Sequence, residues 1–178
     1  MRFLPAAALA ILTALTLQAG EVPRPAKPLK MKSIEGQEIT LSQLRGKVVA
    51  VMFFSTDCPH CQQTTEVLGP IYAEWKSRGL EILGLAVNPS AAGNLQEFKQ
   101  KHGAAFPLGL TTRSDWSGFG EFSVMHNPYV PYLLIVDRNG VIREEHPGQD
   151  RAYWLDQEKR LRESFDALLK EPAKKPAS

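Results

Sequence analysis

Two apolar runs dominate the hydrophobic pattern of the chain. Residues 47–54 read KVVAVMFF and residues 80–87 read LEILGLAV, with no regular alternation of polar side chains. Continuous runs of this length are typical of central strands that are buried on both faces of a sheet. The pattern therefore predicts two such strands in the middle of the fold.

Helical spacing of apolar residues follows each of these runs, and each helical segment ends near a glycine. Residues 62–78 place apolar side chains on one face, and Gly79 follows. A second helix, capped by Ser90 or Asn94, is expected to run to His102. A third is predicted over residues 150–170.

Shorter polar and apolar segments complete the expected elements. Asn139-Gly140 suits a tight turn with positive backbone angles, so the apolar segments on either side of it predict a hairpin. The other expected elements are a hairpin over 32–40, a helical turn over 41–44, a weak strand over 106–110, a loop with one short helix over 111–130, and hairpin strands over 132–136 and 141–145. The order predicts an α/β fold with a central mixed sheet.

The first residues carry a pattern of their own. Arg2 precedes an apolar stretch over residues 3–17, and a small residue, Ala19, stands at a suitable cleavage position. This predicts a signal peptide over residues 1–19. The alternative is a retained membrane anchor, although the stretch is shorter than the ~20 apolar residues of a spanning helix.

Composition assigns the rest of the chain to one globular domain. Of the 178 residues, 43% are hydrophobic and 22% charged. Residues 20–30 are rich in proline and predict a linker, residues 31–170 the domain, and residues 171–178 a disordered tail. The formal net charge of +2 excludes a strongly basic nucleic-acid binder.

The stretch FFSTDCPHC contains both cysteines of the chain, Cys58 and Cys61. By the chain-entropy estimate, a disulfide closing a loop of about four residues stabilises a fold by only ~2 kcal/mol, against nearly 5 for a loop of about a hundred. A structural staple therefore explains the pair poorly. Export places the cysteines in an oxidising compartment, where their pairing is expected.

The cysteines lie where a buried strand ends and a helix begins, and this place suggests their chemistry. Unpaired N–H groups at a helix N-terminus stabilise a thiolate, so Cys58 is the predicted nucleophile. Cys61, one turn further on, is the predicted resolving thiol. Pro59 is expected to start the helix. His60 either adds positive charge near Cys58 when protonated or is an exposed loop residue.

Two segments resemble a known family. Residues 35–61 and residues 130–142 are similar to the thioredoxin-like thiol-disulfide oxidoreductases of the bacterial cell envelope, often grouped as TlpA-like or AhpC/TSA-like. The resemblance implies a thioredoxin-like fold, with helices flanking the sheet and an N-terminal β-hairpin extension. It also implies a cis peptide at Val130-Pro131 opposite the cysteines, where the backbone pairs with a substrate chain.

Three positions depart from the family pattern. Asp57 replaces a common tryptophan and would oppose thiolate formation if it were close and unscreened. Met52 stands where thioredoxin has a buried aspartate, and Thr64 where several envelope reductases have a glutamate. The usual internal proton acceptor is therefore missing, and Glu66 or Asp57 could replace it only with suitable geometry.

A thiol peroxidase and a copper-delivery protein are the alternatives. Peroxiredoxins need Pro-x-x-x-Thr/Ser-x-x-Cys; Ser55 and Cys58 match its second half, but Val51 stands at the proline position. For copper, the two thiolates and one histidine would bind a soft ion. The candidate histidines are His102, His126 and His146, of which only His126 is expected near the cysteines.

The function favoured by these patterns is exchange of disulfides with cysteine-containing envelope proteins, apocytochromes being one candidate class. A membrane redox partner would recycle the Cys58-Cys61 pair, and no cofactor or metal is implied. The mature protein is expected to be a periplasmic or cell-envelope monomer without stable membrane insertion. Whether it reduces or oxidises its partners stays open. Trp116, Phe119 and Phe122 are expected to pack on the core, with a docking surface as the alternative.

Overall fold

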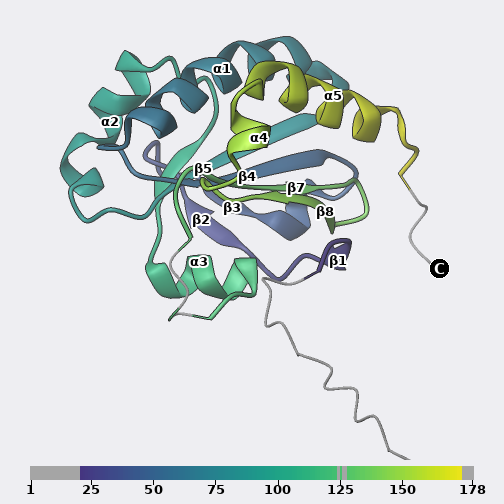
Figure 1. Cartoon of the computed structure of the whole chain (residues 1–178), viewed down its shortest axis with the longest axis horizontal. Coiled ribbons are helices and arrows are strands. Elements are labelled where there is room, and N and C mark those ends of the chain that lie inside the picture. The colour runs from purple at the N-terminus through teal and green to yellow at the C-terminus, as the bar shows by residue number, and fades with distance from the viewer. Residues whose placement is uncertain (1–20, 124, 126–127, 174–178) are drawn as a thin grey trace, which may run out of the picture.

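The computed structural model describes residues 21–123, 125 and 128–173 (Figure 1). The predicted signal peptide lies outside these residues. Within the described part of the chain, no helix combines the length and the apolar character needed to cross a membrane.

A six-stranded mixed sheet forms the centre of the fold, with the order β1-β8-β7-β4-β5-β6. β4 runs parallel to β5 and antiparallel to β7, which confirms the mixed sheet. The strands are β1 (Arg24–Pro25), β4 (Val48–Phe54), β5 (Leu80–Ala86), β6 (Leu108–Leu110), β7 (Tyr132–Val136) and β8 (Val141–His146).

Every residue of β4 and β5 is buried, as expected for strands covered on both faces. Alternate side chains of β4 belong to two separate cores: Met52 and Phe54 pack in one, Val51 and Phe53 in the other. Figure 1 shows why, because helices cover the sheet on one side, and a helix and a small hairpin on the other.

The elements of these outer layers have the following bounds. On the first side lie α1 (Pro59–Trp75) with the 3-10 turn η2 (Lys76–Arg78), α2 (Ala91–Lys101), α4 (Arg151–Trp154) and α5 (Gln157–Lys170). On the second lie α3 (Arg113–Gly120) and the hairpin of β2 (Lys30–Lys32) and β3 (Glu38–Thr40), followed by the 3-10 turn η1 (Leu41–Leu44). The N-terminal hairpin extension is thus confirmed.

One helix prediction was wrong, and the expected start of another is confirmed. The single helix expected over 150–170 is two helices, α4 and α5, separated at Leu155 and Asp156. Helical spacing of apolar residues begins at residue 62, and α1 begins at Pro59, which confirms the expectation that Pro59 starts the helix. A proline suits the first helical position because the N–H that it lacks would have no intrahelical partner there. Ser90 precedes α2 as expected, but its side chain makes no capping hydrogen bond.

The proline-rich segment also differs from the linker that was expected. β1 pairs with β8, so residues 24–25 extend the sheet. Arg24 is buried and bonds Glu121 (2.9 Å) and Glu145 (2.6 Å), while Leu29 belongs to the second core. At the other end, Glu171 pairs with Arg143 of β8 (2.9 Å). The folded domain therefore extends beyond residues 31–170 at both ends.

The aromatic side chains of α3 and of the turn that follows it pack inward. Trp116 and Phe119 on α3, and Phe122 just after it, are buried in the second core. Trp116 stacks on Phe53 of β4, with ring centroids 5.7 Å apart. This confirms the core interpretation of these three residues over the docking surface.

Candidate functional site

The candidate site forms where β4 ends and α1 begins. Cys58 is the N-cap of α1, and Pro59 is its first helical residue. The main-chain N–H of Cys61 donates to the sulfur of Cys58 at 3.3 Å, and the N–H of Gln62 donates to the Cys58 carbonyl at 3.0 Å. The predicted nucleophile thus occupies the helix N-terminus, where free N–H groups favour a negative charge.

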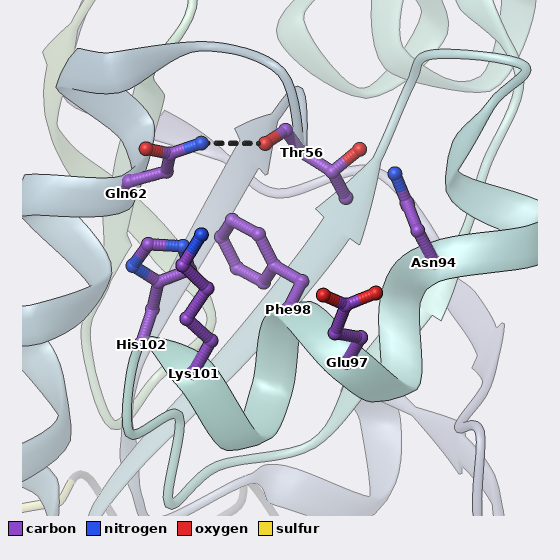
Figure 2. A pocket seen from close by; sticks show the side chains of 7 residues that line it. All are labelled: Thr56, Gln62, Asn94, Glu97, Phe98, Lys101 and His102. Carbon is purple, nitrogen blue, oxygen red and sulfur yellow. Dashed lines mark hydrogen bonds between the residues drawn. The ribbon is translucent and has the colours of Figure 1, made fainter.

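Side chains from two other elements fix the loop that precedes Cys58. Gln62 donates to the carbonyl of Thr56 at 2.9 Å, as Figure 2 shows. Asn88, beyond the end of β5, accepts from the N–H of Thr56 (3.1 Å) and donates to its hydroxyl (2.8 Å). Behind the loop lies a small cavity of about 110 Å³ with mostly polar walls (Figure 2). Thr56 itself is buried, so the loop is rigidly anchored.

Asn88 is a site residue that the sequence reading missed. A signal for it existed, because parallel strands end at the same edge of a sheet, and Asn88 follows β5 as Thr56 follows β4. Gln157, described below, gives no comparable signal, since its position depends on the unexpected break between α4 and α5.

Replacing Asn88 by alanine is expected to lower the free energy of unfolding by about 1–3 kcal/mol, because the buried Thr56 N–H loses its acceptor. Urea denaturation of the reduced protein measures the change. The control is Asn94→Ala, whose buried Oδ1 has no hydrogen-bond partner among the described residues. It should change stability by less than about 0.5 kcal/mol. Equal losses in both variants would contradict the anchoring role.

The two sulfurs have opposite environments. Cys58 is partly exposed, Cys61 is fully buried, and both are free thiols, so the structure shows the dithiol form. Donation from the Cys61 thiol, followed by the main-chain N–H groups of Cys61 and His60, lowers the pKa of Cys58 to about 6 despite partial burial. Burial, and then the bond to Cys58, raises the pKa of Cys61. The predicted disulfide stays a prediction.

The low pKa of Cys58 predicts a specific pH dependence of thiol reactivity. Because only the thiolate reacts, alkylation by iodoacetamide should be half-maximal near pH 6, level off above about pH 7, and fall about tenfold per pH unit well below 6. Stopped-flow alkylation with mass spectrometry assigns the modified cysteine. Labelling of Cys61 first, or a midpoint near the ordinary value of 9.0, would contradict the assignment.

The two side chains expected to modulate Cys58 both contact other side chains. The Asp57 carboxylate is engaged by Ser90 (2.7 Å) and Asn88 (3.1 Å), and it is not among the groups that shift the pKa of Cys58. Burial lowers the pKa of His60, whose ring lies edge-on to Trp154. His60 supports the thiolate through its main-chain N–H. The lowered pKa makes the protonated imidazole less favourable, and whether that charge influences Cys58 stays a prediction.

Glu66 and Thr64 make contacts away from the sulfurs. Glu66 bonds Nδ1 of His102 at 2.8 Å. Thr64 is buried, and its hydroxyl lies 2.9 Å from the carbonyl of His60 and 2.8 Å from Oε1 of Gln157. Thr64, at the sequence position where several envelope reductases have a glutamate, is thus paired with a second neutral side chain, Gln157. Glu66 and Asp57 therefore both bond side chains other than those of the cysteines, and their role as proton acceptors gains no support.

The predicted substrate-binding pair lies beside Cys58. The Val130-Pro131 bond is cis, as expected, and Pro131 is buried. When protonated, the Cys58 thiol donates to the carbonyl of Val130 at 3.8 Å. The main-chain N–H of Gly148 donates to the Tyr129 carbonyl at 2.8 Å and so holds this loop. The role of Val130 and Pro131 in binding a substrate chain stays a prediction.

The geometry of the site adds little support to the two alternative functions, copper delivery and peroxide reduction. Within the described residues, no cluster of histidine, cysteine and carboxylate side chains could hold a metal ion. His102 bonds Glu66, and His146 bonds Glu144 and Asp150. His126 lies outside the described residues. Val51, at the position of the peroxiredoxin proline, is buried in the middle of β4.

Comparison with known proteins agrees with this geometry. The thiol-disulfide oxidoreductase ResA of Halalkalibacterium halodurans is 26% identical over 118 residues, which cover 66% of this chain and 64% of that protein. ResA of Geobacillus thermodenitrificans is also 26% identical, over 64% of this chain and 62% of its own length. The match therefore spans a little under two thirds of these relatives. Peroxiredoxin Q of Suaeda salsa is 30% identical over 64% of this chain and 53% of that protein.

Solved structures share the fold. A thiol:disulfide interchange protein of the thioredoxin family from Chlorobium tepidum superposes with a TM-score of 0.67 at 21% identity, covering 85% of this chain and 99% of that one. Residues 22–145 match the AhpC/TSA family. With a thioredoxin-like fold, a cysteine pair at the start of α1 and a cis proline beside it, the chain belongs to the AhpC/TSA family.

Proposed function

We propose that this chain is an exported thiol-disulfide oxidoreductase that exchanges disulfides with proteins of the cell envelope. The observation that carries the proposal is the pairing of a partly exposed Cys58 of low pKa with a buried Cys61 whose N–H contacts its sulfur at 3.3 Å. An accessible thiolate such as that of Cys58 can attack a partner's disulfide. A buried thiol three residues further along the chain, Cys61, can then complete the exchange. The ResA relatives bear the same activity in their names.

The reaction with an oxidised partner has two steps. The Cys58 thiolate attacks one sulfur of the partner's disulfide, the S–S bond breaks, and the other sulfur leaves as a thiolate. Cys61 then attacks the Cys58 sulfur of the mixed disulfide and releases the first sulfur. Two electrons pass to the partner, and the protein ends as the Cys58-Cys61 disulfide. The departing thiolates take up protons from Cys61 and solvent, because Glu66 and Asp57 are bonded elsewhere.

Exchange itself is tested with the mature protein and a model peptide disulfide. Reduced wild-type protein should convert one equivalent of disulfide to two thiols, and its own two thiols should disappear together. Mass spectrometry of the products and thiol titration follow both partners. Failure to reduce the peptide, together with failure of the oxidised protein to oxidise a dithiol peptide, would overturn the proposal.

Export is supported by the sequence of residues 1–19 alone and needs its own experiment. Cells producing the full chain with a C-terminal tag are fractionated, and the N-terminus of the purified product is determined. We expect a periplasmic or envelope protein beginning at Gly20. A cytoplasmic product that retains residues 1–19 would contradict export and, with it, the envelope partners and the membrane redox partner.

A further inference from the structure

A groove opens beside the redox site, and three of its lining residues have had no role so far. It has a volume of about 470 Å³ and is lined by His60, Gly148, Arg151, Trp154 and Leu155. Its walls come from the start of α1, the turn after β8, and α4 with the residue that follows it.

Two lining residues place the groove next to the redox site. His60 is two residues beyond Cys58 on α1. A Cβ placed on Gly148 would lie 2.8 Å from the carbonyl oxygen of Val130, which is the acceptor of the Cys58 thiol. A chain segment that presents a cysteine to Cys58 would therefore pass over or into this groove.

One wall of the groove is apolar and fixed. Trp154 is buried, and its indole N–H donates to the Pro147 carbonyl at 2.9 Å. Its ring packs edge-on against the ring of His60, with the two ring centroids 5.3 Å apart. Next to it, Leu155 is 88% exposed. An isolated exposed leucine needs no explanation, but one at the rim of a groove with an aromatic wall offers a place for an apolar side chain.

The groove also carries one unpaired positive charge. Arg151 precedes Leu155 by one helical turn, so both side chains lie on the same side of α4. The Arg151 side chain is exposed, and within the described part of the chain it makes no hydrogen bond or ion pair. Burial lowers the pKa of His60, so His60 is mainly neutral at pH 7. The charge of this groove is therefore positive and comes from Arg151.

We propose that the groove binds the partner segment that flanks the exchanging cysteine, with a large apolar side chain against Trp154 and Leu155 and an aspartate or glutamate on Arg151. This proposal rests on the proposed function. It narrows the substrate class to protein segments in which the exchanging cysteine is flanked by a large apolar side chain and an acidic one. Charge complementarity selects this occupant, because a basic segment would be repelled by Arg151.

Synthetic peptides test this preference. Each peptide contains one cysteine, one leucine, and glutamate, glutamine or lysine at a position within three residues of the cysteine, a reach of roughly 10 Å. The peptides are used as symmetric disulfides, and the second-order rate constant for oxidation of pre-reduced protein is measured by stopped flow. Wild-type protein should prefer glutamate over glutamine two- to fivefold at the best position, the effect of one exposed ion pair, and should disfavour lysine.

Charge reversal at Arg151 provides the decisive comparison. Arg151→Glu should invert the order, so that lysine peptides react faster than glutamate peptides, and 0.5 M salt should weaken both preferences. The control is Lys159→Glu on α5, the same charge reversal at an exposed residue that does not line the groove. It should keep the wild-type order.

The possible outcomes distinguish a failure of the groove proposal from a failure of the proposed exchange reaction. Equal rates for all three peptide classes, or inversion by Lys159→Glu as well as by Arg151→Glu, would overturn the groove proposal and leave the exchange reaction intact. Absence of reaction with every peptide would instead overturn the proposed function, and the groove proposal would fall with it.

Discussion

Replacing Cys58 by serine is expected to abolish disulfide exchange, with a loss of roughly 10³-fold or more in the rate constant. The hydroxyl of serine does not ionise in the range where the Cys58 thiol, with its pKa of about 6, is a thiolate. Cys61 cannot replace it, because its sulfur is fully buried and its pKa is raised. Reduction of a peptide disulfide by the purified variants measures the loss.

Variants of Cys61 should leave the first step intact and block the second. Cys61→Ser is expected to form a stable mixed disulfide with the partner, visible by mass spectrometry under non-reducing conditions. Cys61→Ala removes the donor that contributes most to the low pKa of Cys58, so this pKa should rise, whereas the serine hydroxyl can still donate. A mixed disulfide on Cys61 in Cys58→Ser, with none on Cys58 in Cys61→Ser, would reverse the two roles.

Gly148→Ala is expected to slow exchange about tenfold or more and to destabilise the fold by about 1–3 kcal/mol. The new Cβ would lie 2.8 Å from the carbonyl oxygens of both Tyr129 and Val130, so the loop that carries Pro131 must move. That displacement shifts the Val130 carbonyl away from the Cys58 sulfur. Urea denaturation and peptide reduction measure the two effects separately.

Gly93→Ala is the matched control for this substitution. A Cβ at Gly93 meets nothing within 4 Å, and the residue lies inside α2, where alanine is favoured over glycine. We expect unchanged exchange and a slightly raised stability. If Gly148→Ala behaved in the same way, Gly148 would have no part in positioning the loop beside Cys58.

The sequence predicted the centre of the fold well because its signals there are local. The runs that became β4 and β5 are buried on both faces, and such strands show their character in composition alone. The place of Cys58 and Cys61 between a strand and a helix follows from the same local pattern, as does the hairpin around Asn139 and Gly140.

The features that were missed depend on contacts between distant segments. Proline-rich composition says nothing about the pairing of Arg24 with β8 and with two glutamates, which draws the N-terminal segment into the domain. The engagement of Asp57 by Ser90 and the partial burial of His60 against Trp154 likewise arise only on folding. Those contacts determine which neighbouring side chains can influence the pKa of Cys58, and they cannot be predicted from spacing in the sequence.

The reduction potential of the Cys58-Cys61 pair tests the central claim most directly. The mature domain is equilibrated with glutathione buffers, and the two thiols are quantified at each ratio. We expect one reversible two-electron transition between about −270 and −120 mV, its position showing whether partners are kept reduced or are oxidised. In Cys58→Ser the transition should be absent. A wild-type protein whose thiols titrate independently, or never form the intramolecular disulfide, would contradict the assignment of this pair as a redox centre.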